Sequence, residues 1–231
     1  MVLRLDLRDF FPSVSKARVA AIFRTAGYPE RVAALLAGLC CTTTPADIYA
    51  SRPAGPADWN LRKTLEIPHL PQGAPTSPAL GNLCGFRLDC RLAGLARASG
   101  ADYTRYADDL TFSGGRDFAR SVRRFEITAA AIALEEGFAV NHRKTRAMGK
   151  SVSQSTAGLV VNDRVAIPRE MFDRLKAILF NCVRFGPRSQ NRDGHPDFQA
   201  HLAGHIAQVA AIDPRREERL KRLWEQICWK D

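Results

Sequence analysis

The tetrapeptide Tyr106-Ala107-Asp108-Asp109 places two adjacent carboxylates between two apolar runs of β type. These runs cover 101–105 and 110–113, so the sequence predicts a hairpin with the two aspartates at its tip. Two ionised aspartates repel each other there unless a cation lies between them. Taken alone, the pair is typical of an ordinary turn, because Asp stabilises turns through side-chain hydrogen bonds to nearby backbone. The rest of the sequence decides between these two interpretations.

A third aspartate, Asp6, ends a short upstream strand with alternating apolar residues, and Pro12 prevents that strand from continuing. Phosphoryl transfer by two divalent cations about 3.5 to 4 Å apart needs carboxylates from separate strands, so that both the attacking and the leaving oxygen are held. Asp6, Asp108 and Asp109 fit this requirement. A site of carboxylates without Cys or His suits Mg²⁺, which prefers oxygen ligands. We therefore expect two Mg²⁺ ions, with Mn²⁺ as the alternative metal.

Two further segments carry polar groups suited to phosphates. The loop 70–78 is rich in Pro and Gly and opens a helix, with Thr76 or Ser77 as the N-cap and Pro78 at the first helical position. Backbone N–H groups at such a helix start can face a phosphate or a sugar. The segment 137–145 is predicted to be a short strand and turn that presents Lys144.

These segments, in this order, resemble the palm of reverse transcriptases, most closely those of bacterial retrons and group II introns. The motifs that carry the resemblance are Asp-x-x-Asp-Phe-Phe-Pro-Ser at 6–13 (motif A), Leu-Pro-Gln-Gly-x-Pro-x-Ser-Pro at 70–78 (motif B), Tyr-x-Asp-Asp at 106–109 (motif C), Asn-x-x-Lys-Thr at 141–145 (motif D) and Gly-Leu-Val-Val-Asn at 158–162 (the primer-grip region). The resemblance implies an α+β fold. A polymerase palm, with an antiparallel sheet packed on helices, would span 1–168, and a helical thumb-like region would span 169–231.

The resemblance also implies a role for each matching carboxylate. Asp6 and Asp108 would hold the two metals, and Asp109 would complete the acidic cluster. Phe11 would be a steric gate, because a bulky ring there clashes with a ribose 2′-OH, the group that distinguishes RNA units from DNA units. The incoming nucleotide is therefore expected to be a deoxynucleotide.

The remaining matched residues would contact the nucleotide and the primer. Asp9, Gln72 and Gly73 would line the nucleotide pocket, and Lys144 would act as general acid towards pyrophosphate or neutralise its charge. For each of the polar side chains a simpler interpretation stays open: a turn cap for Asp9, and a solvated surface residue for Gln72 and Lys144. Gly158 and Leu159 would belong to the primer grip.

The implied function is that of an RNA-directed DNA polymerase that joins a primer 3′-OH to the α-phosphate of a deoxynucleotide. Its partners would be an RNA template, a DNA or RNA primer and dNTPs. The family places a fingers region before motif A, and we expect that region to be absent from this sequence and supplied by a longer protein or a separate chain. A noncoding RNA is a further candidate partner. The alternative is a catalytically silent nucleic-acid-binding remnant or a split-polymerase subunit, and the biological role, such as phage defence or retrotransposition, stays open.

The composition agrees with a nucleic-acid partner. A net charge of +10 and a pI of about 9.7 over 231 residues give a positive field that suits a polyanion. No apolar run approaches the roughly 20 residues of a membrane helix, so no membrane partner is expected. The six cysteines show no Cys-x-x-Cys spacing, which predicts neither a zinc site nor a disulfide framework and favours a reducing, cytoplasmic setting.

Periodicity predicts helices over 16–27, 30–41, 78–99, 118–136, 169–183, 196–211 and 214–229, a loop over 42–60 and a hairpin over 160–167. The helix over 78–99 would bury a stripe that includes Leu83. In the helix over 196–211, Asp197, His201 and His205 share one face. We interpret them as a polar face that contacts phosphate or sugar and not as a metal site, because no ligand from another element is evident.

Overall fold

The computed structural model describes residues 1–45, 47–48 and 56–229. The chain divides into two compact units, Met1–Gly149 and Lys150–Asp231, and each has its own hydrophobic core. This boundary differs from the one predicted after residue 168. The segment 150–168 packs with the helical unit, because Ile167 lies in its core and Leu159 packs against that core.

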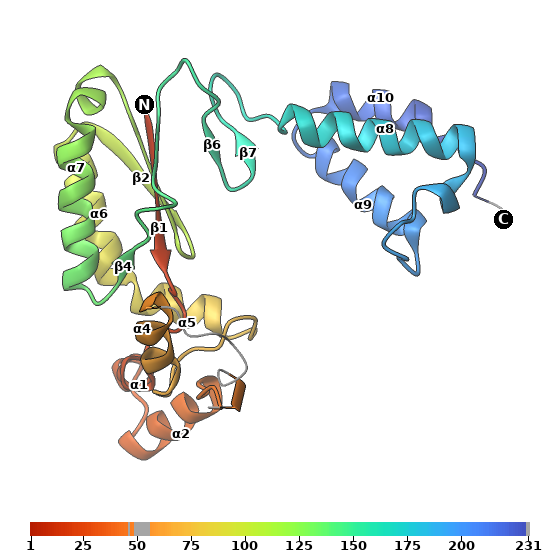
Figure 1. Ribbon diagram of the computed structural model, residues 1–231. Coiled ribbons are helices and arrows are strands. Elements are labelled where there is room, and N and C mark those ends of the chain that lie inside the picture. Colours follow the sequence, from red (N-terminus) through yellow and green to blue (C-terminus); the bar gives the residue numbers. More distant parts are fainter. Residues whose placement is uncertain (46, 49–55, 230–231) are drawn as a thin grey trace. The chain divides into compact units, whose positions relative to one another are not determined.

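The first unit is built on a five-stranded antiparallel sheet (Figure 1). Its central strand β1 (Val2–Arg8) pairs with β3 (Asp109–Gly114) along one edge and with β4 (Ala139–Val140) and β5 (Arg146–Met148) along the other. Strand β2 (Ala101–Tyr106) forms a hairpin with β3. The predicted upstream strand is confirmed, although it ends at Arg8 and not at Asp6. The hairpin predicted around Asp108 and the α+β class are confirmed as well.

Helices cover one face of this sheet. Leu3, Leu5 and Leu7 alternate along β1 and are fully buried on that face, as expected of a half-buried strand. Helices α6 (Phe86–Ala98) and α7 (Arg116–Glu135) lie side by side against it (Figure 1). Their buried stripes include Leu92 and Phe125. The opposite face of β1 carries Arg4 and Asp6.

Within the described residues, the first unit also contains helices α1 (Lys16–Thr25), α2 (Glu30–Cys40), α4 (Pro56–Leu65) and α5 (Ser77–Cys84). Helix α1 packs against α2 and α5. The loop predicted over 42–60 is wrong from Pro56 onward, since a helix begins there at a proline, which suits the first helical position. Residues 46 and 49–55 of that predicted loop lie outside the described residues.

The single helix predicted over 78–99 is wrong, because α5 and α6 are separated at Gly85. A Cβ added at Gly85 would lie 3.0 Å from the Arg105 guanidinium, so the side chain of Arg105 on β2 lies against this junction. The buried stripe continues across this junction through Leu80, Cys84, Leu88 and Leu92. Leu83, predicted to be buried, is 53% exposed.

The second unit is mainly helical, with a short hairpin of β6 (Ser155–Thr156) and β7 (Leu159–Val160) before its helices. The helices are α8 (Arg169–Phe185), the 3₁₀ turn η1 (Pro187–Ser189), α9 (Phe198–Ala210) and α10 (Pro214–Trp224). The hairpin predicted over 160–167 is reduced to one bridge between Val160 and Ala166. The Asn162 side chain accepts a hydrogen bond from the Gln154 N–H and donates one to the Val152 carbonyl. It therefore stabilises the loop and not a pair of strands.

None of the six cysteines forms a disulfide bond. Within the described residues, no helix combines the length and the hydropathy required to cross a bilayer.

Candidate active site

The hairpin of β2 and β3 ends in a two-residue turn. Tyr106 pairs with Asp109, which leaves Ala107 and Asp108 as the loop residues. Ala107 has a φ of 51°, in the left-handed region that a two-residue hairpin requires and that residues other than glycine rarely adopt. The Asp108 carbonyl accepts a hydrogen bond of 2.8 Å from the Leu7 N–H. The turn is therefore anchored beside the end of β1.

Sheet register brings the second aspartate of the pair opposite Asp6. Asp6 and Asp109 are partners across β1 and β3. Like charges directly opposite each other destabilise a sheet. Arg4, two residues before Asp6 and therefore on the same face, donates from Nε to Asp109 Oδ1 at 2.7 Å. Arg4 thus neutralises one of the two facing carboxylates.

Lys144 neutralises the other carboxylate. Its Nζ donates to Asp6 Oδ2 at 3.1 Å, and the Asp6 side chain is only 10% exposed. The Asn141 N–H donates to the Asp6 carbonyl at 2.7 Å, which ties the turn after β4 to the end of β1. The Lys144 side chain is 62% exposed, as expected of a solvated lysine, but its ammonium group also pairs with a buried carboxylate.

A hollow of about 250 Å³ lies at the end of β1, and we call it the strand pocket. It is lined by Asp6, Leu7, Arg8, Asp9, Phe10, Phe11, Pro12, Gln72, Asp108, Asn141 and Lys144. Six of the residues predicted for the site thus come together here, from four separate segments. Asp109 and Gly73 do not line the pocket. The predicted primer-grip residues Gly158 and Leu159 belong to the second unit.

The two phenylalanines of motif A differ in their surroundings. Phe10 is 3% exposed and stacks on Phe138 at 5.3 Å between ring centroids, so it is a core residue. Phe11 is half-buried and lines the strand pocket. Helix α5 reaches both rings because Gly81 has no side chain; a Cβ there would lie 3.1 Å from Phe10 and 3.2 Å from Phe11.

Asp9 lies at the turn that follows β1, with a φ of 48°. The turn is held by the Asp9 carbonyl and not by a cap from the Asp9 side chain: the carbonyl accepts hydrogen bonds of 2.9 Å from both the N–H and the hydroxyl of Ser13. The carboxylate is free to line the pocket. Burial raises its pKa above the usual value; Arg8 and Lys144 oppose this shift, and Asp6 adds to it.

The loop before α5 supplies Gln72 to the pocket. Gly73 has a φ of 93°, so this position favours glycine. Thr76 occupies the N-cap position but makes no side-chain capping bond, and the Ser77 hydroxyl donates to the Pro71 carbonyl at 2.6 Å. The N-cap predicted at Thr76 or Ser77 is thus confirmed at Thr76, although without a side-chain capping bond, and Ser77 fixes the shape of the loop.

Arg105 is a supporting residue that the sequence interpretation missed. Its side chain is 5% exposed and forms a bidentate pair with Asp89 of α6, at 2.7 and 2.6 Å. It also donates to the Ala107 carbonyl at 3.1 Å, inside the aspartate turn. Tyr103 donates to the same Asp89 at 2.7 Å, and both burial and this contact raise the Tyr103 pKa.

Period-two alternation along β2 could have indicated this contact, since it places Arg105 on the side of Tyr103 that faces the helices. The bond to Asp89 also raises the pKa of Arg105, which stays charged in any case. The result is a buried charge pair that links the tip of the hairpin to helix α6. The geometry assigns Arg105 a positioning function for the turn.

The chemistry of the donors suits a hard divalent cation, since the carboxylates of Asp6 and Asp108 offer oxygen ligands to one pocket. Among the residues that the structure describes, however, no group of three or more His, Cys, Asp or Glu side chains is arranged to hold a metal ion. The contacts explain this difference from the predicted triad. Arg4 draws the Asp109 carboxylate towards itself, and Lys144 occupies one oxygen of Asp6.

No family model matches the chain. It is similar to the retron Mx65 reverse transcriptase of Myxococcus xanthus, with 43% identity over 96% of this chain and 48% of that protein. The retron Mx162 reverse transcriptase of the same organism is 36% identical over 94% of this chain and 45% of the relative. The retron Ec86 reverse transcriptase of Escherichia coli is 30% identical over 95% of this chain and 58% of the relative. The chain thus spans about half the length of these curated relatives.

Proposed function

Because the chain belongs to the bacterial retron reverse transcriptase family, we propose that it forms the palm and thumb portion of an RNA-directed DNA polymerase. One observation carries the proposal: strand register places Asp6 opposite Asp109, while Asp6, Asp108, Phe11, Gln72 and Lys144 meet at the strand pocket. Carboxylates, a lysine and an aromatic ring in one hollow suit a nucleotide triphosphate held through metal ions. The reaction joins a primer 3′-OH to the α-phosphate of a deoxynucleotide.

Asp6 and Asp108 are the residues that would hold Mg²⁺, with Asp109 as the third carboxylate of the cluster. Bound Mg²⁺ would supply electrostatic stabilisation of the attacking and leaving oxygens. Arg4 and Lys144 keep the carboxylates paired before a metal enters, because two facing aspartates would otherwise repel each other. When the triphosphate binds, Lys144 is within reach of the same carboxylate region and neutralises or protonates the departing pyrophosphate.

Phe11 selects the sugar in this proposal. Its half-buried ring lines the pocket beside the buried Phe10, so a ribose 2′-OH would meet an aromatic edge that cannot retreat into the core. Gln72 and Asp9 line the same hollow and contact the nucleotide, and Gly73 gives the loop its left-handed turn. Gly158 and Leu159 stay a proposed primer grip on the basis of their motif.

The partners in this proposal are an RNA template, a DNA or RNA primer and dNTPs, and a noncoding RNA or a fingers-containing chain is a further candidate. The proposal is tested by primer extension on an RNA template with Mg²⁺ and dNTPs, using the chain alone and within the full product of its gene. The variant is Asp108→Ala. The matched control is Asp102→Ala, an exposed aspartate on the same hairpin that does not line the strand pocket.

Extension is expected with the unmodified protein and with Asp102→Ala, and it should fall by roughly 10³-fold or more with Asp108→Ala. Extension that survives Asp108→Ala would overturn the assignment of the carboxylates. If no protein extends a primer, although primer–template binding is measurable, a catalytically silent nucleic-acid-binding protein or a split-polymerase subunit is the better description.

A further inference from the structure

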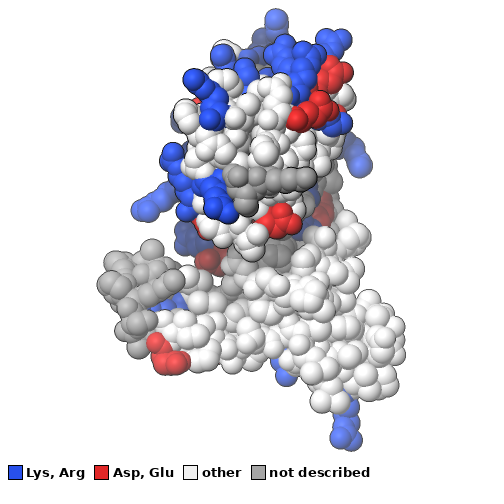
Figure 2. Space-filling view, turned by 90° about the vertical axis from the view of Figure 1, so that its right-hand side faces the viewer, with Lys and Arg blue, Asp and Glu red and all other residues white. Residues whose placement is uncertain are grey.

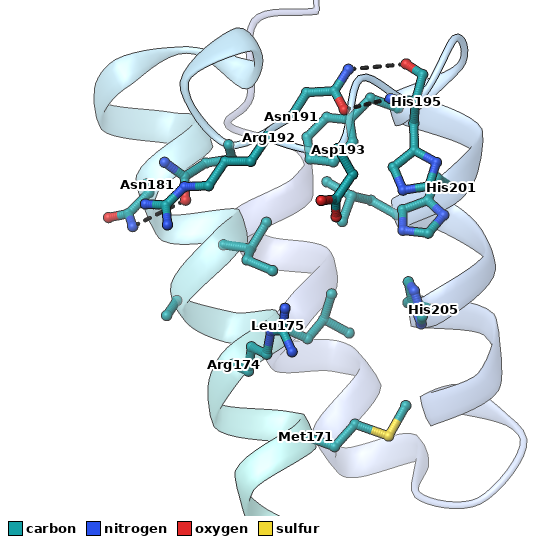
Figure 3. Close-up of a pocket in the computed structure, with 15 residues that line it drawn as sticks. Met171, Arg174, Leu175, Asn181, Asn191, Arg192, Asp193, His195, His201 and His205 are labelled. Carbon is teal, nitrogen blue, oxygen red and sulfur yellow. Dashed lines mark hydrogen bonds between the residues drawn. The ribbon is translucent and has the colours of Figure 1, made fainter. Parts of the chain in front are cut away.

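The second unit contains a hollow of about 520 Å³ between α8, α9 and the segment that connects them, and we call it the histidine pocket (Figure 3). Its lining residues are Met171, Arg174, Leu175, Ala177, Ile178, Asn181, Gln190, Asn191, Arg192, Asp193, His195, Phe198, His201, Leu202 and His205. None of them is part of the strand pocket. The proposed polymerase chemistry therefore leaves this hollow unexplained.

One wall of the histidine pocket is a row of imidazole rings (Figure 3). His195 and His201 stack with 3.9 Å between ring centroids and an angle of 17°, and His205 meets His201 edge-on at 4.7 Å. Phe198 lies nearly parallel to His201 at 6.3 Å. Spacing of four residues on α9 places His201 and His205 on one face. His195 is added from the preceding loop.

The loop that carries His195 is fixed by its own hydrogen bonds. The Asn191 side chain donates to the His195 carbonyl at 2.9 Å and accepts from its N–H at 2.8 Å. Gly194, between them, has a φ of 65°, which favours glycine at this turn. Asp197 caps α9 by accepting from the Ala200 N–H at 2.8 Å, which explains the aspartate of the predicted polar face. The ring wall is therefore preformed.

The histidines are not arranged as a metal site. In the described ranges, no three or more His, Cys, Asp or Glu side chains are placed to share a metal ion, and Asp197 is engaged as a cap. Desolvation, together with the charges that His195 and His205 would carry, lowers the pKa of His201, while Asp193 opposes this shift. Neutral imidazoles each offer one donor and one acceptor, besides a ring face.

The remaining lining has two different characters. Leu175 and Leu202 are buried and form an apolar floor. Arg174 and Arg192 are exposed and add positive charge at the rim, and Figure 3 shows Arg174 and His205 reaching the hollow from opposite helices. Asn181 and Gln190 add amide groups, which are held together by a 3.3 Å hydrogen bond.

The lining of the hollow carries a small excess of positive charge, with Arg174 and Arg192 against Asp193. Lys and Arg outnumber Asp and Glu between residues 150 and 231, and Figure 2 shows their side chains gathered over the face of this unit that it presents. Such a field attracts anions. A ligand that matches every feature has a flat ring for the imidazole wall, polar ring edges for the amides, and a phosphate for the arginines.

We propose that the histidine pocket is a second site, which binds a single nucleotide: either a free nucleotide or an unpaired nucleotide presented by a single strand. The ring lies against the imidazole wall formed by His195, His201 and His205. The phosphate faces Arg174 and Arg192. A fully paired nucleotide does not enter, because its ring is stacked inside a duplex and its polar edge is already hydrogen-bonded.

The experiment uses the full chain and three probes: AMP, a short single-stranded oligoadenylate, and the same strand in a perfect RNA duplex. Binding is measured by calorimetry, and the imidazole proton signals of the protein are followed by NMR. The variants are His201→Ala and Arg174→Gln. The matched controls are Gln208→Ala on α9 and Lys176→Gln on α8, since both residues are exposed and neither lines the pocket.

We expect AMP or the single strand to shift the signals of His195, His201 and His205. Affinity should fall about tenfold or more in His201→Ala, the scale of one lost base–ring stack, and severalfold in Arg174→Gln. Both controls should bind as the unmodified protein does. Binding of AMP identifies a free-nucleotide site, whereas binding of the single strand alone identifies a strand site.

Two outcomes would overturn the proposal. One is unchanged affinity for both AMP and the single strand in both pocket variants, with normal circular dichroism. The other is a duplex that binds the pocket as tightly as the single strand and shifts the same imidazole signals. Neither outcome depends on polymerase activity, so the failure of this proposal is separate from the failure of the proposed function.

Discussion

The strand pocket and the histidine pocket hold polar groups in opposite ways. In the strand pocket most of the polar groups are charged, and Asp6 is held by sheet register and neutralised by Lys144. In the larger histidine pocket the wall is made of imidazoles and amides on helices and a loop, and full charges lie mainly at the rim. The difference teaches that volume does not identify the chemistry: the smaller hollow suits metal-dependent transfer, while the larger one suits recognition of a flat polar ring.

The largest effect is expected when a charge is removed from the strand pocket, and this change should leave the histidine pocket unaffected. Asp6→Asn keeps the shape of the side chain but removes the charge that pairs with Lys144 and would bind metal. Primer extension should fall roughly 10³-fold, while AMP binding at the histidine pocket stays unchanged, because the two units have separate cores. Single-turnover extension and calorimetry on the same protein check both halves. A loss of AMP binding in Asp6→Asn would mean that the pockets are not independent.

The second effect concerns the rigidity of the strand pocket. Arg105→Ala removes one partner of a largely buried ion pair and should lower the free energy of unfolding by about 2 to 4 kcal/mol, measured by urea denaturation. Arg105→Lys should recover only part of this loss, because lysine lacks the planar fork that binds both oxygens of Asp89.

The matched control for Arg105 is Arg120→Ala, because Arg120 pairs with Asp117 at the surface, where its side chain is 80% exposed. That change should alter stability by less than about 0.5 kcal/mol. Steady-state kinetics of Arg105→Lys test the positioning role. In this variant kcat should fall more than KM changes, because the Ala107 carbonyl loses its donor. Equal effects of Arg105→Ala and Arg120→Ala would contradict the positioning role.

A smaller effect is expected where helix α5 touches the strand pocket. Gly81→Ala adds a methyl group 3.1 Å from Phe10 and 3.2 Å from Phe11. Phe10 is fixed in the core, so Phe11 should move into the pocket, and the KM for dNTPs should rise severalfold with a change in stability of about 1 kcal/mol or less. Phe11→Ala should instead remove the ring from the pocket and weaken the discrimination against rNTPs. Unaltered dNTP kinetics in Gly81→Ala would show that the two rings yield elsewhere.

The smallest effect is a pH dependence. Because burial raises the pKa of Asp9 in the folded state, its ionised form is disfavoured there, and the carboxylate destabilises the fold at neutral pH. This penalty disappears as the pH falls through the raised pKa towards the ordinary aspartate pKa of 3.8. Asp9→Asn should therefore be slightly more stable than the unmodified protein at pH 7.5 but not at pH 4, in thermal melts at both values. A constant difference across this range would assign the effect to something other than ionisation.

The local sequence pattern predicted well where the residues of the strand pocket lie, but it did not predict the residues that hold them in place. Alternation along 3–6 and 101–113 placed the carboxylates on strands and at a turn, because period two is a property of the local chain. The partners of these residues could not be derived in the same way. Arg105 pairs with Asp89 next to the helix break at Gly85. Both features depend on how a helix packs on a strand.

The histidine pocket shows the same division. Four-residue spacing correctly put His201 and His205 on one helix face. It could not supply His195, which reaches the wall through a loop held by Asn191. It also assigned Asp197 to that polar face, although the residue caps the helix. Contacts made through irregular segments follow no period, so sequence spacing does not predict them.

The position of β1 at the centre of the sheet has a consequence for how the molecule folds. The β2–β3 hairpin joins neighbours in sequence and can form early, whereas the described strands that pair with β1 all begin at Asp109 or beyond. Closing so long a loop is slow, because its entropy must be lost before the contacts are gained. Asp6 meets its partners only in that late step. In refolding experiments, recovery of primer extension should therefore lag behind the recovery of helical circular dichroism.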